Sequence, residues 1–176
     1  MISESRYWKR PLLKVATWLQ KLELSKDTVD RTLVRVEKEL FLGFYTVRKL
    51  LETFKVSDST RQLKFEIVWF PNIKSVDYFN AHRLHELFDL AMPTVEVRDI
   101  GFLCNQFIHS FIFSTVTMDN HIEGFFVSSD RARNERLYFI EVDRVVSIFR
   151  TVGQDYPKKA EFIRNPVTQQ WEGKVG

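Results

Sequence analysis

Apolar residues recur at every third or fourth position across Val29–Phe54, the longest periodic pattern in the chain. Steps of three and four place such residues on one face of an α-helix. The pattern predicts a long amphipathic helix that begins at a cap formed by Ser25 or Asp27 and ends near Phe54. A shorter pattern over Pro11–Glu23 predicts a helix upstream, because proline is favoured at the first helical position.

After residue 60 the pattern changes to alternation of apolar and polar residues. Apolar residues at 63, 65, 67 and 69 alternate with Lys64 and Glu66 and predict a strand with one buried face, whose alternation Val68 and Phe70 interrupt at the far end. Ile122–Ser128 and Leu137–Glu141 predict two more strands, and Asp119-Asn120 predicts a hairpin turn before the first of them. Ala160–Arg164 predicts an edge strand near the end of the chain.

Helical patterns also occur between these strands. Asp77 is placed to cap a helix that runs to about Leu90 and ends at Met92-Pro93. A second start near Thr94 or Glu96 predicts a helix that leads into the most apolar part of the chain. Val142–Val152 has helical spacing and predicts a helix that ends at a glycine.

The most apolar segment, Ile100–Met118, contains no Lys, Arg, Asp or Glu. It has about the minimum length of a membrane-spanning helix. However, Asn105, Gln106 and His109 interrupt it, and the residues after Phe111 are rich in β-branched side chains, which favour a strand. We therefore expect a buried helix that runs into a strand, and no membrane span.

Together these patterns predict an α+β fold. An N-terminal helical pair would pack on an antiparallel sheet of about four to five strands with interleaved helices. We expect one globular domain over residues 1–176, with a helical part at about 8–56 and a mixed part at about 62–172. The helix at 26–54 also allows a homodimer seam as an alternative to packing within its own domain.

Composition narrows the classes of function only slightly. The formal net charge is +3 and the isoelectric point is about 9.0, with no long run of like charges, so an acidic partner is permitted but not required. The single cysteine, Cys104, excludes an internal disulfide and is expected to be a buried, inert thiol. The N-terminal residues lack an apolar signal core, so a cytoplasmic location is expected. No glycine-rich phosphate loop or paired-cysteine site is present, and no cofactor is expected.

Three groups of polar residues are candidates for chemistry. The first lies in the uncharged segment and contains Asn105, Gln106, His109 and Ser110. Asn105 and Gln106 precede His109 by four and three residues, so they can share one face of the predicted helix with it. His109 would act as an acid or base near neutral pH in a polar pocket. The alternative is an internal hydrogen-bond network that satisfies buried groups.

The second group is a loop between two predicted strands, which carries Arg131, Arg133, Asn134 and Arg136. Arginines on such a loop would contact phosphates. Nearby aromatic residues would offer a stacking face for bases, namely Phe125, Phe126, Tyr138 and Phe139. The alternative is an ordinary solvated hairpin loop.

The third group is His82, His85, Glu86 and Asp89, which would share one face of the predicted helix that starts at Asp77. Two imidazoles and two carboxylates could converge there on a metal ion. The string differs from the zinc-protease motif H-E-x-x-H in its last residue, and no third ligand follows at a distinctive spacing. The solvated face of an amphipathic helix is the alternative, and no metal is expected.

We therefore expect a non-catalytic binding or adaptor protein that engages nucleic acid or an acidic protein through the Arg131–Arg136 loop. The alternative is a hydrolase or nuclease that uses His109, with Gln106 and Asn105, or the face that contains His82 and His85. The sequence contains no complete catalytic constellation, so it does not establish an enzyme.

Overall fold

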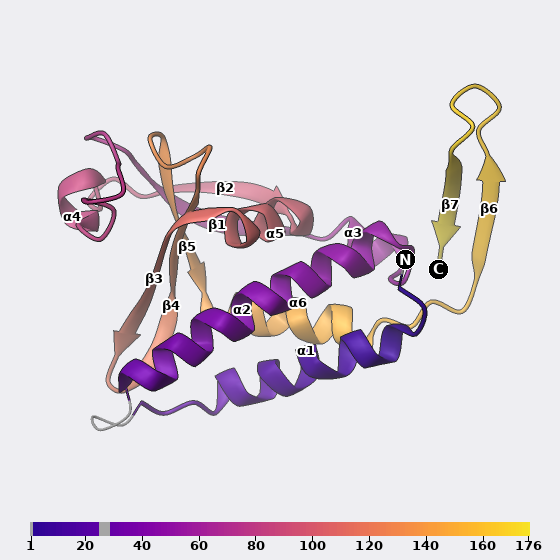
Figure 1. Ribbon diagram of the computed structural model, residues 1–176, viewed down its shortest axis with the longest axis horizontal. Coiled ribbons are helices and arrows are strands. Elements are labelled where there is room, and N and C mark those ends of the chain that lie inside the picture. Colours follow the sequence, from indigo (N-terminus) through magenta and orange to yellow (C-terminus); the bar gives the residue numbers. More distant parts are fainter. Residues whose placement is uncertain (1, 25–28) are drawn as a thin grey trace.

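The computed structural model describes residues 2–24 and 29–176, and its fold is α+β (Figure 1). Five antiparallel strands form one sheet in the order β2-β1-β5-β4-β3. The predicted fold class and sheet size are therefore confirmed. The strands of this sheet are β1 (Lys64–Pro71), β2 (Thr94–Asp99), β3 (Ser110–Met118), β4 (His121–Ser129) and β5 (Arg136–Glu141).

Three helices form a layer against one face of this sheet, and a fourth lies between that layer and the strands (Figure 1). The layer contains α1, α2 and α6, and α5 packs between α2 and β4. A short turn of helix, α3, follows α2. The bounds are α1 (Ser5–Gln20), α2 (Val29–Glu52), α3 (Asp58–Arg61), α4 (Leu84–Leu87), α5 (Ile100–Ile108) and α6 (Val142–Gln154).

The apolar stripe of α2 is buried in the core of its own chain. Val36, Leu40 and Phe44 are fully buried there. Gly43 permits the close approach of α6, because a Cβ at this position would lie 2.3 Å from Cζ of Phe149. The surface that a dimer seam along this stripe would need is therefore occupied by the chain's own helices. The predicted caps Ser25 and Asp27 lie outside the described residues.

The turn between β3 and β4 follows the prediction. Asp119 and Asn120 have φ values of 48° and 65°, and Met118 pairs with His121 on either side of them. Two consecutive residues with positive φ are typical of the type I′ turn, whose twist matches that of the flanking strands. The uncharged segment also follows the prediction, because α5 is succeeded directly by β3.

The predicted helix start near Thr94 or Glu96 is wrong. Thr94–Asp99 forms β2, which pairs antiparallel with β1 at the edge of the sheet. The side chain of Asp99 accepts a hydrogen bond of 2.7 Å from the backbone N–H of Phe102 and so caps α5. The alternation of valine with charged residues in β2 was the signal for a strand.

The predicted helix from Asp77 to Leu90 is also wrong, because only Leu84–Leu87 is helical. Oδ1 of Asp77 accepts hydrogen bonds from the backbone N–H groups of Phe79 and Asn80 at 2.7 and 3.0 Å. Side chains that bond to nearby backbone groups compete with helical hydrogen bonds and stabilise turns. This segment therefore folds as a series of turns beside one short helix.

The chain ends in a two-stranded antiparallel hairpin of β6 (Ala160–Arg164) and β7 (Trp171–Val175). It extends away from the sheet and helices, beside the N-terminus (Figure 1). Only β6 was predicted, since Gly173 weakens the strand pattern of β7. Among the described residues, no helix is long and apolar enough to cross a membrane.

Candidate functional site

The structure brings three residues of the first candidate group and one of the second, Arg131, together around one pocket, which we call the α5 pocket. It has a volume of about 630 Å³ and lies between α5, the loop that joins β4 to β5, and β5 itself. Pockets of this size are typical of sites for small organic ligands. Its lining residues are Phe102, Asn105, Gln106, His109, Ser129, Asp130, Arg131, Ala132, Glu135 and Tyr138.

Gln106 lies at the base of the α5 pocket and is only 5% exposed. Its Oε1 accepts a hydrogen bond of 3.0 Å from the backbone N–H of Ser129. This bond connects α5 to the end of β4. It also occupies the oxygen of the Gln106 amide, so the nitrogen Nε2 is the end that remains. Gln106 therefore has both roles that the sequence left open, because it satisfies a buried backbone group and it lines a pocket.

Tyr138 is the second nearly buried residue of the pocket, at 3% exposure. Its ring packs edge to face against Phe102, with a centroid distance of 5.2 Å. Burial raises the pKa of the Tyr138 phenol, and the nearby carboxylate of Glu96 raises it further, while Arg136 and Arg98 oppose the rise. The phenol is therefore protonated at neutral pH.

The exposed edge of the pocket carries His109, Asn105 and Arg131. Oδ1 of Asn105 accepts a hydrogen bond of 2.6 Å from Arg48, so its Nδ2 remains as a donor. Within the described residues Arg131 makes no ion pair. Ser110, the fourth residue of the first group, is half-buried at the start of β3 and does not line the pocket.

The other predicted binding residues of the loop have interaction partners within the same protein. Arg133 pairs with Asp130 at 3.3 Å and lies over the ring of Phe111 at 4.1 Å. Arg136 pairs with Glu96 at 2.8 Å and lies over Trp69 at 4.4 Å.

Asn134 also has a structural partner. Its Oδ1 accepts a hydrogen bond of 2.7 Å from the backbone N–H of Val76. The predicted stacking face is not formed as proposed, because Phe125 and Tyr138 are buried in the core beneath the helices. Of the loop arginines, only Arg131 is both exposed and unpaired among the described residues.

The third candidate group loses its common face, because α4 includes His85 and Glu86 but neither His82 nor Asp89. The His85 side chain is exposed, and its nearest carboxylate oxygen, on Glu86, is 3.9 Å away. Among the residues that the structure describes, no three His, Cys, Asp or Glu side chains gather closely enough to hold a metal ion.

Cys104 is buried in α5, as predicted. Burial raises the pKa of its thiol to about 12. A thiol with so high a pKa is almost entirely protonated at neutral pH, and the thiolate is the form that attacks an electrophile. Cys104 is therefore a core residue and not a nucleophile.

A second surface was missed by sequence reasoning, because it is built from the two ends of the chain. The helix α1 contains Arg6, Lys9, Arg10 and Lys14 and no acidic residue. Residues 156–176 contain four more lysines and arginines and only two glutamates. Since the whole chain is only +3, the remainder is net negative, and this charge asymmetry was the available signal.

We call this region the terminal surface. Its members are the exposed cations and aromatic residues of α1 and the hairpin, together with Lys55, which lies between α2 and α3. They are Arg6, Tyr7, Trp8, Arg10, Lys14, Lys55, Lys158, Lys159, Phe162, Arg164, Trp171 and Lys174.

A pocket of about 280 Å³ joins the start of α1 to the base of the hairpin. Lys55, Lys158 and Lys159 line this lysine pocket together with Tyr156, and no carboxylate is among its described lining residues. The described wall of this pocket therefore contains three lysines and no counter-charge.

Lys9 holds the floor of this region together and is fully buried. Its Nζ donates hydrogen bonds to the backbone carbonyls of Lys55, at 2.6 Å, and Asp155, and it lies 4.3 Å from the ring centre of Tyr156. Burial lowers the pKa of Lys9 and Lys55 lowers it further, whereas Asp155 raises it.

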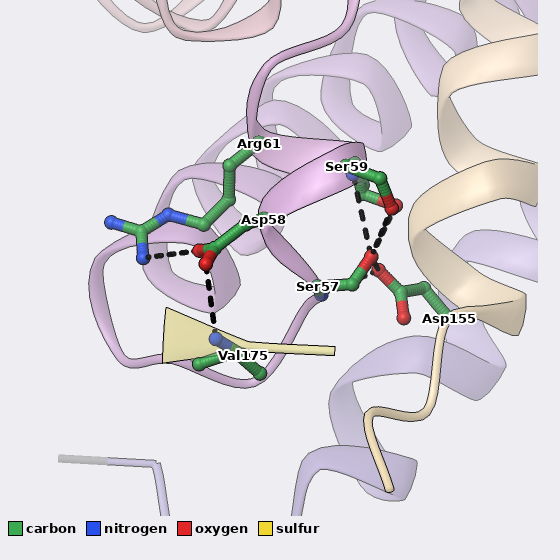
Figure 2. Close-up of polar contacts among 7 residues, drawn as sticks. Ser57, Asp58, Ser59, Arg61, Asp155 and Val175 are labelled. Carbon is green, nitrogen blue, oxygen red and sulfur yellow. Dashed lines mark hydrogen bonds and ion pairs between the residues drawn. The ribbon is translucent and has the colours of Figure 1, made fainter. Parts of the chain in front are cut away.

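The same region is fixed by two carboxylates (Figure 2). Oδ2 of Asp155 accepts hydrogen bonds from the backbone N–H and the hydroxyl of Ser57, at 2.7 and 2.8 Å. Oδ2 of Asp58 accepts one of 3.0 Å from the backbone N–H of Val175 in β7. These contacts connect the segment after α2 with the end of α6 and with the hairpin, so the lysine pocket has a defined shape.

Comparisons of the chain with protein-family models, with curated proteins and with solved structures find no match. Function is therefore inferred from the geometry and charge of the described residues alone.

Proposed function

We propose that this protein is a non-catalytic binding protein for single-stranded nucleic acid and that the terminal surface is its contact face. The observation that carries the proposal is the concentration of eight lysines and arginines against two glutamates on α1 and residues 156–176. Seven of these cations are on the outside, while Lys9 is buried beneath the lysine pocket. Such an excess of cations attracts a polyanion, and binding gains free energy because the counterions of the polyanion are released.

The exposed aromatic residues favour nucleic acid over other polyanions. Tyr7 is 62% exposed on α1, and Trp171 is 61% exposed on the hairpin, where Phe162 is also on the surface. Aromatic rings between cations provide stacking positions for bases while the cations contact phosphates. A duplex hides the faces of its bases, so this combination suits a single strand.

A lipid surface is a poorer partner for the same helix. A helix that lies in a membrane interface buries its apolar face among the lipids. The apolar face of α1, with Leu12, Ala16 and Leu19, is instead buried in the protein core. The basic face, with the exposed rings of Tyr7 and Trp8, remains outside.

The test is the binding of a labelled single-stranded oligonucleotide, measured by fluorescence anisotropy over a series of salt concentrations, for wild type and for Lys158→Gln/Lys159→Gln. For each phosphate contact removed, the slope of log affinity against log salt should fall by roughly 0.7. Arg133→Gln is the matched control, because its partner Asp130 already neutralises it. Equal binding by wild type and the lysine variant would overturn the assignment of this surface.

Two further probes separate the alternatives. A duplex of the same length should bind more weakly, because it cannot stack on Tyr7 and Trp171. A polyglutamate peptide of similar charge should also bind more weakly than the single strand. Tighter binding of the peptide would replace the nucleic-acid proposal with one for an acidic protein partner.

The hydrolase alternative has less support. His109 is exposed at the α5 pocket, and the carboxylate of Asp130 in the same pocket is paired with Arg133. A general base requires a hydrogen-bond partner that orients it, and within the described residues no side-chain hydrogen bond orients His109. Cleavage of the bound oligonucleotide by wild type, and its loss in His109→Ala, would support the enzyme instead.

A further inference from the structure

We infer that β2 is an interface strand and that its partner is a second copy of this chain, whose β2 pairs with it antiparallel across a two-fold axis. The strand forms one end of the open five-stranded sheet. The inference does not depend on nucleic-acid binding, because β2 shares no residue with the terminal surface. It depends on three properties of β2, namely its free edge, its regular geometry and the order of its side chains.

The outer edge of β2 has no backbone partner in the described part of the chain. On its inner side the strand pairs with β1 over its whole length. No backbone group of residues 94–98 forms a hydrogen bond to a described backbone group outside the sheet. Alternate residues of an antiparallel strand direct their N–H and C=O groups away from the neighbour already paired. These groups are therefore open to a further strand.

The strand also lacks the features that usually prevent pairing at a free edge, which are unbalanced charge, proline, a β-bulge or a covering element. β2 contains no lysine or proline, Glu96 and Arg98 neutralise each other at 2.8 Å, and the register with β1 has no shift. The opposite edge strand, β3, differs, because its register with β4 shifts twice and Phe113 packs on Phe41 of α2. Of the two edges of this sheet, β2 is the one suited to accept a strand.

The order of charged residues in β2 is complementary to itself. When Val97 lies opposite Val97 of the second copy, Glu96 lies opposite Arg98 of that copy, and the reverse, because opposed residues are equally distant from the centre. Each carboxylate then has one arginine beside it on its own strand and another across the interface. A register centred on Glu96 would place two glutamates directly opposite each other, which is destabilising. The charges therefore favour a second copy and select one register.

The exposed valines of β2 are covered by the same pairing. Val95 and Val97 are 62% and 57% exposed, on the side of the sheet away from Glu96 and Arg98, because side chains alternate along a strand. The pairing brings the two Val97 side chains together and places Val95 diagonal to Val97 of the second copy. A strand of six residues forms a small interface, so the dimer is weak, with a Kd above about 1 µM.

Disulfide trapping in the full chain tests the register. In Val97→Cys the two thiols are directly opposed, with Cα atoms about 4.5–5.5 Å apart, within the range that a disulfide spans. In Val95→Cys the two thiols are offset by four residues, about 13 Å along the strand, which is too far to bond. Cys104 is buried and does not compete. With oxidised glutathione, Val97→Cys should form a covalent dimer and Val95→Cys should remain monomeric.

Sedimentation velocity over a series of protein concentrations measures the association itself. Wild type should shift from monomer towards dimer as its concentration rises. Val97→Lys places two like charges at the centre of the interface and should abolish this shift. Val34→Lys, at a valine of α2 that is 65% exposed, is the matched control and should associate like wild type. Thermal unfolding of each variant verifies that it is folded.

The inference is overturned if wild type stays monomeric at millimolar concentration, if Val97→Lys associates as well as wild type, or if Val95→Cys forms the covalent dimer as readily as Val97→Cys. Lys158→Gln/Lys159→Gln should associate like wild type. The result for β2 and the result for the terminal surface are therefore independent of each other.

Discussion

The loop that carries Arg131, Arg133 and Arg136 and the terminal surface are both basic, but they differ in what neutralises their cations. In the loop, Arg133 is paired with Asp130 and Arg136 with Glu96. On the terminal surface, Lys55, Lys158 and Lys159 share a pocket without a carboxylate in its described wall. The sequence of the loop resembles a phosphate-binding element, but carboxylates of the same protein neutralise two of its three arginines.

The difference shows that the meaning of a basic residue depends on its spatial neighbours. Glu96 lies 40 positions before Arg136 in the chain and meets it only because β2, β1 and β5 are adjacent in the sheet. An arginine that is paired with a carboxylate and stacked on an aromatic ring stabilises the fold, whereas an unpaired arginine is available to a ligand. Five variants test this comparison, from the largest expected effect to the smallest.

The largest effect is expected from Lys9→Met, which tests whether the lysine pocket depends on the buried floor beneath it. The carbonyls of Lys55 and Asp155 lose their donor, and unsatisfied buried acceptors cost about 1–3 kcal/mol in total. Chemical denaturation measures this loss of unfolding free energy. A variant as stable as wild type would show that the two hydrogen bonds of Lys9 do not contribute to the free energy of unfolding.

The same variant has a defined pH dependence. Burial lowers the pKa of Lys9 from its ordinary value of 10.5, so between the native pKa and 10.5 the unfolded chain binds more protons than the folded one. The stability of wild type relative to Lys9→Met should therefore rise with pH across that window and stay constant below it. A constant difference across the window would contradict a lowered pKa.

The next largest effect is expected from a change at Glu96, whose carboxylate neutralises Arg98 and Arg136. Glu96→Gln keeps the shape but removes the charge that Arg98 and Arg136 share. The pairs are partly exposed, so we expect a loss of about 1–2 kcal/mol of unfolding free energy. Oligonucleotide affinity should rise, because two arginines are released. Unchanged affinity would mean that neutralisation by Glu96 is not what prevents these arginines from contacting the oligonucleotide.

Trp171→Ala tests the aromatic part of the terminal surface. Base stacking on an exposed ring contributes about 1–3 kcal/mol per base, so affinity for a single strand should fall by at least about 5-fold at fixed salt. The slope against salt should not change, because no cation is removed. Tyr78→Ala, at an exposed ring outside this surface, is the control and should bind like wild type.

A smaller effect is expected from Asp58→Asn, which tests the anchor of the hairpin. The acceptor of the Val175 N–H loses its charge (Figure 2), and a charged acceptor forms a stronger bond than a neutral one. The amides of β6 and β7 should exchange hydrogen roughly 2- to 5-fold faster, a local change of about 1 kcal/mol or less. The amides of the five-stranded sheet should be unaffected, and their acceleration would mean that the change is global.

The smallest effect is expected from Arg131→Gln on nucleic-acid binding. Arg131 is the exposed, unpaired arginine of the loop, yet Asp130 and Glu135 lie in the same pocket wall. Removing it should change oligonucleotide affinity by less than about 2-fold in the anisotropy assay. A larger loss would return the nucleic-acid site to the arginine loop and would end the distinction between the two regions.

The elements with strong local patterns could be predicted from the sequence. The three-and-four spacing of α2, the alternation in β1 and the Asp119-Asn120 turn each depend on residues close together in the chain. The helix-then-strand interpretation of the uncharged segment was correct for the same reason. The predictions failed where a local polar side chain competed with a weak helical pattern, as Asp77 does, or where a short strand needed a partner, as β2 does.

By itself, the sequence determined the fold class, the buried cysteine and the three polar groups worth testing. Only the tertiary structure decided which of their members are available. It placed Gln106 and Tyr138, which are 32 positions apart, at one pocket and paired Arg136 with the distant Glu96. It also brought segments from both ends of the chain together at the lysine pocket. The physical reason is that electrostatic and hydrogen-bond energies depend on distance and burial, which residue spacing does not specify between elements far apart in the chain.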